Sequence, residues 1–295
     1  MQHFIFRALR GRKLVQSRAA GSTVLVAVFA AALFVTLVGG AAAAAHGVPL
    51  GTATRFAVLA GSGITNTGPT TVTGDLGTYP TTSMTGTGSL TINGTNQAGD
   101  AVTQQAKSDL VIAYKTAAGE GPTSPITADL GGQNLNPGVY NSASSIGLTG
   151  TLTLNAHGNP DAMFVFQAGS TLKTASASSI ALVNGARACN VYWQVGSSAT
   201  LGTGSTFRGS ILAHDSITVT TGTTVYGRVL ARNGAVTLDT DTIHRSACAQ
   251  THKHKGGKGH KGHKGHKGHK GHKGHGGSGS TGTAHPPKRP VGLTG

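Results

Sequence analysis

Three threonines in the second half of the chain recur at a fixed interval. Thr206, Thr224 and Thr242 lie 18 residues apart, and each precedes a bulky apolar residue. Rotation of the branched threonine side chain is restricted, so a regular array of threonines would hold its hydroxyl and methyl groups in fixed positions. The chemistry that such an array offers is hydrogen bonding and apolar contact, repeated along a surface.

The elements that must position these threonines are short strands in stacked turns. Between Ser205 and Arg245 the apolar residues keep the same 18-residue interval, and they alternate with threonines, as in Ile217-Thr218-Val219. A period near 20 residues without a helical pattern is typical of a coil of β-strands, in which each turn presents the same apolar column inward. The third repeat gains a residue near Asn233 and loses one before Ile243, so the period is approximate.

The alternation places a second candidate column of threonines on the outside of the coil. This column contains Thr200, Thr218 and Thr237. Threonine is also a favoured residue on the solvent side of any strand, so the columns alone do not establish a binding site. Which of the two columns dominates depends on which side of the coil is covered by a helix.

One helix is predicted, over residues 97–118. Asp100 near its start and Gly119 just after its end are typical of helix boundaries. Its apolar residues follow helical spacing and form one stripe, made of Ala101, Ala106, Leu110, Ala113, Tyr114 and Ala117. We expect this stripe to pack lengthwise along one face of the coil, and that face is then excluded from binding.

The composition agrees with a mainly β fold and excludes a ligand chosen by bulk charge. The chain of 295 residues contains 46 glycines, and only 11% of its residues are charged, which suits short strands joined by tight turns. The formal net charge of +15 is concentrated at the two ends, whereas residues 46–249 hold nine basic and nine acidic residues. We therefore expect no specific binding of nucleic acid by the folded part.

The N-terminal residues 1–45 have the pattern of an export signal. A basic region is followed by the apolar stretch Val24 to Val38 and by a run of alanines from Ala41 to Ala45. A cleaved signal peptide is the preferred interpretation and a membrane anchor is the alternative, so the protein is expected to be secreted or held at the cell surface. Export also favours a disulfide between the only two cysteines, Cys189 and Cys248.

Residues 250–295 are rich in lysine, histidine and glycine and are predicted to be disordered. Adhesion to anionic cell-wall polymers or other polyanions is the preferred role, and a solubilising spacer is an alternative. A third interpretation is metal binding by the evenly spaced histidines His260, His263, His266, His269 and His272.

Catalytic motifs are missing from the sequence. It has no nucleophile elbow, no zinc-protease motif and no phosphate-binding glycine loop, and Glu120 is its single glutamate. A group of polar residues in the last two turns is interpreted as a solvated rim, and comprises His214, Asp215, Arg232, Asp239, Asp241 and His244. No enzymatic activity and no cofactor are predicted.

Several motifs in a fixed order resemble the ice-binding-protein family of bacteria, algae and fungi. They include Phe56-Ala-Val-Leu-Ala-Gly61, Val72-Thr-Gly-Asp-Leu-Gly77, Pro137-Gly-Val-Tyr140, Leu148-Thr-Gly-Thr-Leu-Thr-Leu154, Phe164-Val-Phe-Gln167, Trp193-Gln-Val-Gly-Ser197 and Gly227-Arg-Val-Leu-Ala-Arg-Asn-Gly-Ala-Val-Thr-Leu238. The resemblance spans residues 50–249. It implies a right-handed, discontinuous β-solenoid of triangular section, with one long helix alongside and the first strands joining the turn formed last.

The resemblance also implies a function and a motif. Members of the family adsorb to ice and inhibit its growth and recrystallisation, and many carry a T-A/G-x-T/N motif on a flat face. The pattern matches Thr203-Gly-Ser-Thr206, Thr221-Gly-Thr-Thr224 and Thr67-Gly-Pro-Thr70. The third turn departs from it, because Thr240-Asp241-Thr242 is one residue short, and an aspartate there would disturb a flat edge.

Physical reasoning supports a flat site for ice. Stacked strands lie about 4.7–4.9 Å apart, close to a repeat of the ice lattice, so each threonine could contribute a methyl contact and a held water molecule. We therefore predict a monomeric domain over residues 46–249 that binds ice through Thr67, Thr70, Thr203, Thr206, Thr221, Thr224, Thr240 and Thr242. The alternative is a non-enzymatic adhesin or a structural solenoid of the cell wall.

Overall fold

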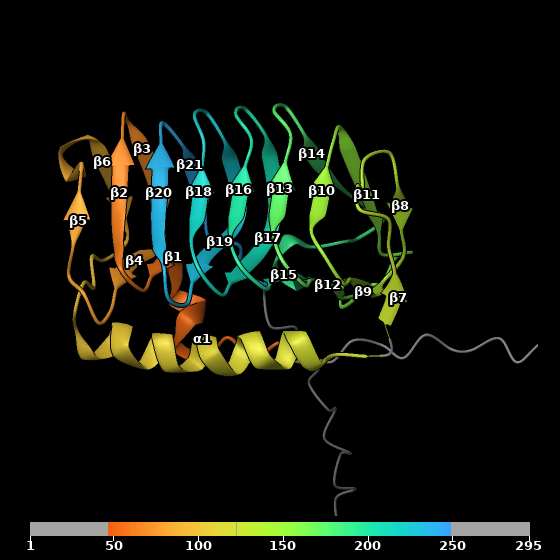
Figure 1. The fold of residues 1–295 in the computed structure, drawn as a ribbon, viewed down its shortest axis with the longest axis horizontal. Helices are drawn as coiled ribbons and strands as arrows, with labels where there is room; N and C mark the ends of the chain where they lie inside the picture. Colours follow the sequence, from red (N-terminus) through yellow and green to blue (C-terminus); the bar gives the residue numbers. More distant parts are fainter. Residues whose placement is uncertain (1–46, 122, 249–295) are drawn as a thin grey trace, which may run out of the picture. The chain divides into compact units, whose positions relative to one another are not determined.

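The computed structural model describes residues 47–121 and 123–248, which form a mainly β fold of parallel strands with one α-helix (Figure 1). The predicted export segment and the histidines of the predicted tail lie outside the described residues. Within the part that is described, no helix is long and apolar enough to cross a bilayer.

The first of two sheets has seven strands, all paired in parallel, which lie side by side across the front of Figure 1. We call its outward surface the front face. In spatial order the strands are β10 (Ile146–Leu148), β13 (Leu172–Thr174), β16 (Ala199–Leu201), β18 (Ile217–Val219), β20 (Ala235–Asp239), β2 (Gly63–Thr67) and β5 (Met84–Thr85).

The second sheet has 14 strands in two ladders that share the long strands β17 (Thr206–Ala213) and β19 (Thr224–Ala231). One ladder continues from the first halves of these two strands, and we call its outward surface the side face. Its other strands are β8 (Asn134–Leu135), β11 (Thr151–Asn155), β14 (Ser179–Val183), β21 (Thr242–His244), β3 (Thr70–Thr73) and β6 (Leu90–Asn93).

The third ladder continues from the second halves of β17 and β19. Its other strands are β7 (Thr123–Pro125), β9 (Gly138–Ser142), β12 (Phe164–Ala168), β15 (Val191–Val195), β1 (Phe56–Ala60) and β4 (Asp75–Thr78). Three short 3-10 helices complete the fold: η1 (Gly51–Arg55), η2 (Thr87–Ser89) and η3 (Ala188–Asn190).

The register of the strands confirms that the 18-residue period is one turn of the coil. Thr206 pairs with Thr224, and Thr224 pairs with Thr242, each as direct neighbours in parallel strands. The early strands β1, β2 and β3 then pair with β19, β20 and β21, so the first part of the chain joins the turn formed last, as expected.

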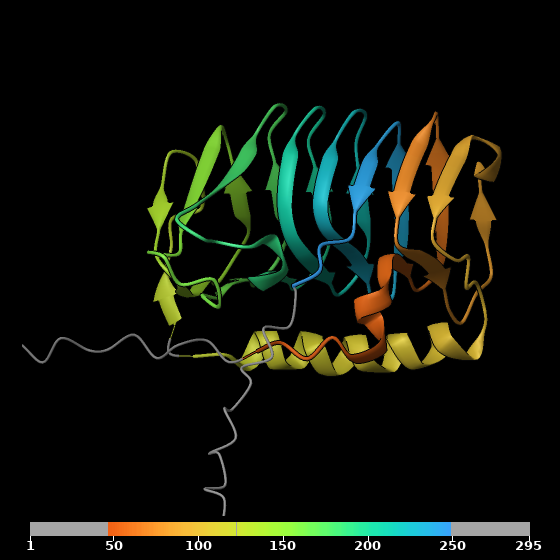
Figure 2. The ribbon, with the colours of Figure 1, turned by 180° about the vertical axis from the view of Figure 1, so that it is seen from behind.

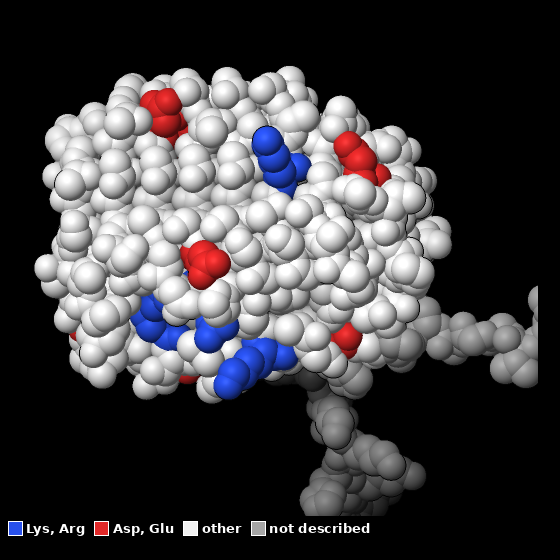
Figure 3. Space-filling model, in the orientation of Figure 1, with Lys and Arg blue, Asp and Glu red and all other residues white. Residues whose placement is uncertain are grey.

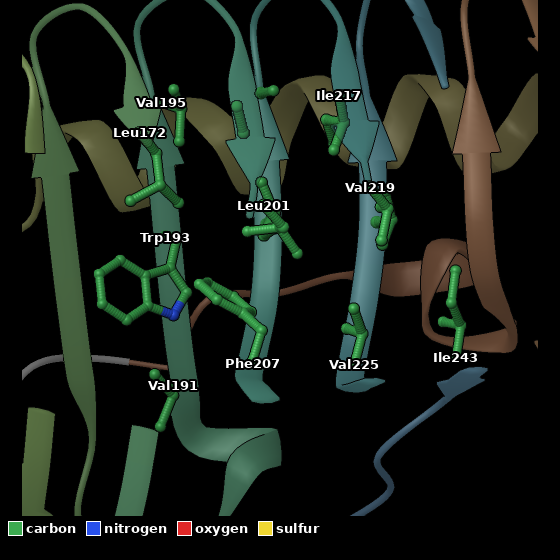
Figure 4. Packing of buried hydrophobic residues seen from close by; sticks show 14 of the residues in the cluster. Leu172, Val191, Trp193, Val195, Leu201, Phe207, Ile217, Val219, Val225 and Ile243 are labelled. Carbon is green, nitrogen blue, oxygen red and sulfur yellow. The ribbon is translucent and has the colours of Figure 1, made fainter. Parts of the chain in front are cut away.

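The core is an apolar column that repeats from turn to turn. Figure 4 shows Phe207, Val225 and Ile243 on successive strands, and all three are almost completely buried. At the middle of the stack the buried column contains aromatic residues, and the rings of Trp193 and Phe166 stack with their centroids 3.9 Å apart. This packing fixes the strands that carry the outward side chains.

The helix α1 (Ala101–Gly119) begins four residues later than predicted. The backbone of residues 97–99 is still part of the strand ladder, since Gln97 N donates to Leu76 O at 2.8 Å and Gly99 N donates to Thr78 O at 2.9 Å. The Asp100 carboxylate then caps the helix by accepting from Thr103 N at 2.7 Å. The polar group that starts the helix was correctly recognised, but the ladder holds the residues before it.

The helix covers the outward side of the third ladder (Figures 1 and 2). Ala106, Leu110, Ala113 and Ala117 of its buried stripe form a cluster with outward residues of the ladder, which include Leu59, Val165, Leu212 and Leu230. The third ladder is therefore unavailable to a ligand, whereas the helix leaves both the front face and the side face open.

The predicted disulfide is present between Cys189 and Cys248, with the two Cα atoms 5.5 Å apart. It joins η3 to the segment that follows the last strand, across 59 residues of sequence. A crosslink that closes a loop of this length stabilises a fold by about 4 kcal/mol in the chain-entropy model.

Candidate functional site

The central column of the front face contains five threonines in consecutive strands. Direct pairing of strands joins them in one row, which runs Thr200, Thr218, Thr237, Thr65, Thr85. The first three are the predicted second column. Thr65 and Thr85 extend it, and both side chains are exposed. At the other end the row continues through Lys173 and Gly147.

The columns on either side of this row are made of small residues. Side chains two positions along a strand point to the same side, so these columns lie two residues before and two residues after the row. The column before it contains Thr171, Ser198, Ser216 and Ala235, and the column after it contains Ala175, Gly202, Thr220, Asp239 and Thr67. Every residue except Asp239 is Gly, Ala, Ser or Thr, and Figure 3 accordingly shows few charged side chains over this sheet.

Asp239 is the one acidic residue among these columns, and its carboxylate is hydrogen-bonded at the edge of the front face. It accepts hydrogen bonds from the hydroxyls of Thr221 and Thr240. The hydrogen bond from Thr221 is the main cause that lowers the pKa of Asp239 below its ordinary value. The carboxylate therefore stays charged at neutral pH.

Asp241 does not disturb the surface, contrary to the expectation from the sequence. Its residue is 2% exposed, and its carboxylate accepts from Thr223 N at 3.0 Å and from Asp239 N at 2.7 Å. Burial raises the pKa of Asp241 to about 7. Asp241 precedes Thr242 as Ser205 precedes Thr206 and Thr223 precedes Thr224, and all three of these positions are buried.

The turns between the front face and the side face contain the first threonine of the predicted motif in three successive turns. Thr203, Thr221 and Thr240 are all exposed at these corners. Thr240 has a φ of 56°, in the left-handed region that Gly222 of the preceding turn also occupies with a φ of 72°. These three threonines border both faces and belong to neither row.

The motif around Thr67 is displaced by one residue from its predicted alignment. Thr67 pairs with Asp239 on the front face, whereas Thr70 is 1% exposed and its hydroxyl accepts from Asp241 N at 3.0 Å. The residue that pairs with Thr242 is Thr71. A slip of one residue in a strand moves a side chain to the other side of the sheet, which explains why Thr70 is buried.

The side face contains the other predicted column, which is longer than expected. Its seven hydroxyl residues are direct neighbours in successive strands, in the order Thr151, Ser179, Thr206, Thr224, Thr242, Thr71, Thr91. The hydroxyls of Thr151 and Ser179 lie 2.9 Å apart. Considered without its neighbours, this row is as suitable a contact surface as the row of the front face.

A second column makes the side face uneven. Two residues beyond the threonines, Arg208, Tyr226 and His244 stand side by side in successive strands. The Arg208 guanidinium lies 4.9 Å from the centre of the Tyr226 ring, and the rings of Tyr226 and His244 stack at 5.5 Å. Tyr226 is 40% exposed, so this stack stands higher than the threonines beside it.

The polar residues interpreted as a rim do not form a site. His214 Nδ1 and Asp215 Oδ1 are 2.8 Å apart, and Asp215 lies beside Gly234, just before the start of strand β20. Asp239 and Asp241 lie at the other end of that strand. No group of three or more His, Cys, Asp or Glu residues that could hold a metal ion is found in the described part of the chain.

The parts of the site that sequence reasoning missed are Thr65, Thr85 and Thr71. The first two lie more than 100 residues from Thr200 in the sequence, and the periodic pattern around Ser205 to Arg245 does not reach them. The signal that could have found them was the implied joining of the first strands to the last turn, which sets Thr65 beside Thr237.

The fold and these surfaces define a class: a β-helix protein with a helix along one ladder and rows of hydroxyl side chains on the two others. The model of the ice-binding-like family matches residues 58–244, and the chain belongs to this family. Among its relatives is an ice-binding protein of Nostoc sp. (strain HG1), 50% identical over 201 residues, which cover 68% of this chain and 74% of that protein.

Solved structures of the family have the same fold. An ice-binding protein from an Antarctic Biological Consortium is 46% identical, with a TM-score of 0.66 over 67% of this chain and 90% of that one. An ice-binding protein from the ascomycete Antarctomyces psychrotrophicus is 40% identical, with a TM-score of 0.67 over 69% of this chain and 100% of that one.

Proposed function

We propose that this protein binds ice through its front face and thereby inhibits ice growth and recrystallisation, without catalysis and without a cofactor. The observation that carries the proposal is the row of five threonines in register, flanked on both sides by small residues with the exception of Asp239. Family membership supplies the ligand, and the geometry of the described residues favours this surface.

The spacing of the row suits a crystalline ligand. Neighbouring strands repeat at about 4.7–4.9 Å, and columns two residues apart repeat at about 6.6–6.8 Å. Each methyl group removed from water contributes only about 0.8 kcal/mol, so the strength of binding depends on many contacts made together. Because the β-helix backbone already fixes these side chains, little conformational entropy is lost when ice is bound.

Flatness favours the front face over the side face. On the side face, the stack of Arg208, Tyr226 and His244 rises beside the threonines, and its guanidinium would have to lose water on contact with a crystal. On the front face the equivalent column contains Gly202, Thr220 and Asp239. The front face is therefore the surface that we propose a planar ligand contacts along several strands at once.

A matched pair of substitutions tests the choice of face. Thr218 and Thr224 belong to the same turn and both point outward, so T218Y and T224Y add the same ring to different faces. We expect T218Y to raise the lowest concentration that inhibits recrystallisation more than tenfold, and T224Y to change it less than about twofold. The unfolding temperature of both variants serves as the control for folding.

Two other results would overturn different parts of the proposal. If T224Y is inactive and T218Y active, the side face binds ice. If the unchanged domain leaves growing ice crystals unaffected, the function itself is wrong, and the alternative of an adhesin or a structural cell-wall protein gains support. Binding of cell-wall glycans by the unchanged domain is the measurement for that alternative.

The proposal also covers the handedness and cross-section of the coil, the oligomeric state and the location of the protein. We propose a right-handed, discontinuous β-solenoid of triangular section, acting as a monomer outside the cytoplasm. Export is supported by the basic and apolar pattern of residues 1–45 and by the disulfide, which persists in oxidising compartments. N-terminal sequencing of the protein from medium and membrane fractions distinguishes a cleaved signal from an anchor, and light scattering measures the oligomeric state.

The lysine- and histidine-rich residues 250–295 are proposed to hold the protein on anionic cell-wall polymers. The ten basic residues of this segment, without an acidic one, supply the charge. Retention on an anionic polymer should fall steeply with added salt and disappear when residues 250–295 are removed. Retention that survives salt but not a chelator would favour a metal-binding tail.

A further inference from the structure

We propose that Lys173 sets the limit of the ice-binding area, so that ice contacts the front face over β5, β2, β20, β18 and β16 only. This inference rests on the proposed function and specifies its extent. Lys173 occupies the position in β13 that threonines occupy in the next five strands, and its direct partner in β16 is Thr200. The lysine thus replaces a threonine in an otherwise regular row.

The side chain of Lys173 is exposed and stands alone on its strand. Its neighbours in the row are Thr200 on one side and Gly147 on the other, neither of which can neutralise a charge. Among the described residues it forms neither an ion pair nor a hydrogen bond through its ammonium group. The ammonium group is therefore hydrated, on a flexible four-carbon stem that reaches further from the sheet than threonine does.

A hydrated ammonium group opposes contact with ice in two ways. The crystal surface would have to displace its water without supplying a matching charge, which is unfavourable. It would also have to confine a stem that rotates freely in solution, which costs entropy. Beyond Lys173 the row passes through Gly147, which lacks a side chain, to Asp129, whose exposed side chain carries a second charge. The row therefore stops being a continuous surface at β13.

This limit defines how long the contact area is and which parts of the chain form it. Five strands separated by four intervals span about 19 Å along the stack. Thr65 and Thr85 come from the first part of the folded chain, whereas Thr200, Thr218 and Thr237 come from its last turns. The binding area is complete only where these two parts of the chain pair, at the junction of β2 and β20.

The test is the substitution K173T, which extends the row from five threonines to six. We expect the lowest concentration that inhibits recrystallisation to fall about three- to fivefold, as one more methyl-sized contact is added and a hydrated charge is removed. The matched control is K115T, which makes the same change of charge at an exposed position of α1, away from the front face. K115T should leave the inhibition unchanged.

Two further variants separate the possible causes of a gain. K173R keeps the charge and the reach of the side chain and should behave like the unchanged protein. K173E keeps a hydrated charge but reverses its sign, so it should also show no gain. A gain in K173E equal to that of K173T would mean that net charge, and not the extent of the surface, controls activity, and the inference would be overturned.

Failure of this inference is distinguishable from failure of the proposed function. If T218Y abolishes inhibition while K173T leaves it unchanged or weakens it, the front face binds ice but Lys173 does not limit it. If T218Y retains full inhibition, the front face is not the ice-binding surface, and both conclusions fall together. The unfolding temperature of every variant is measured alongside, so that a misfolded protein is not counted as either result.

Discussion

The front face and the side face are built by the same turns of the chain, yet the side chains that flank their threonine rows differ in size. Both carry a row of threonines at the spacing of stacked strands, and the row of the side face is the longer of the two. They differ in the next column, which contains Gly202, Thr220 and Asp239 on the front face. On the side face that column is the stack of Arg208, Tyr226 and His244.

The comparison shows that a periodic row of threonines is insufficient to identify a contact surface. Backbone spacing is common to both faces, because the strands of one turn belong to one rigid coil. What distinguishes them is the height of the side chains two residues away, and we propose that this height decides whether a planar ligand reaches the row. The neighbouring column therefore has to be considered together with the threonines.

The largest effect is expected when the uneven column is copied onto the flat face. The triple variant T200R/T218Y/T237H places the three residue types of the side-face stack in the same order along the front-face row. Inhibition of recrystallisation should be lost, by more than about a hundredfold in the required concentration, since three contacts are removed and the ligand is held away. Measured inhibition within tenfold of the unchanged domain would contradict the choice of face.

The reciprocal variant, R208T/Y226T/H244T, is the matched control for that experiment. It flattens the side face without touching the front face. Inhibition should be retained in full or improved, because a second flat row becomes available. A loss of inhibition in this variant, with an unchanged unfolding temperature, would show that the stack itself takes part in binding.

A smaller effect is expected from Asp239, the one acidic residue of the flanking columns. Its carboxylate is turned toward Thr221 and Thr240 at the corner, so it hinders contact less than a free charge would. D239T should improve inhibition by about twofold at neutral pH, because a charged group leaves the edge of the contact area. D161T, in the exposed loop after β11, is the control and should have no effect.

The smallest effect concerns stability alone and comes from the buried carboxyl of Asp241. Burial raises its folded pKa to about 7, whereas the unfolded value is about 3.9. Between these values the folded state binds the proton more strongly, so the folded protein is most stable at the acidic end and loses stability as pH rises toward 7. Unfolding temperatures measured from pH 4 to pH 7 should fall in the unchanged domain.

The variant D241N isolates this contribution. An amide does not titrate, so the decline in unfolding temperature over this pH range should become shallower. Recrystallisation inhibition by the unchanged domain should stay constant over the same range, since Asp241 is buried below the corner and does not belong to either row. An identical pH profile in both proteins would mean that the proton is bound elsewhere.

Much of the fold could be predicted because it depends on local periodicity. The 18-residue interval of Thr206, Thr224 and Thr242 became the strand register directly, and the apolar stripe of α1 packed on one ladder as expected. Pairings between distant parts of the chain were not visible in that period. Thr65 and Thr85 entered the row only through strands that precede the repeat by more than 100 residues.

The candidate site was harder to predict because burial alternates with every residue. The motif at Thr67 matched the pattern one position out of register, so Thr70 was assigned outward and lies inside. Asp241 was placed on the surface for the same reason. We expected the position of the helix to show which of two threonine columns is free to bind. The helix covers a third ladder, so the choice between the columns rests on the height of side chains such as Tyr226.

The length of α1 restricts how the protein can be enlarged. Its 19 residues extend about 28 Å, and every additional turn inserted into the coil would lengthen the ladder beneath it by about 4.8 Å. An insertion between β16 and β18 would therefore leave an apolar strip uncovered unless the helix also gained about three residues. A duplicated repeat would therefore call for a compensating insertion within α1, which lies far from the repeats in the sequence.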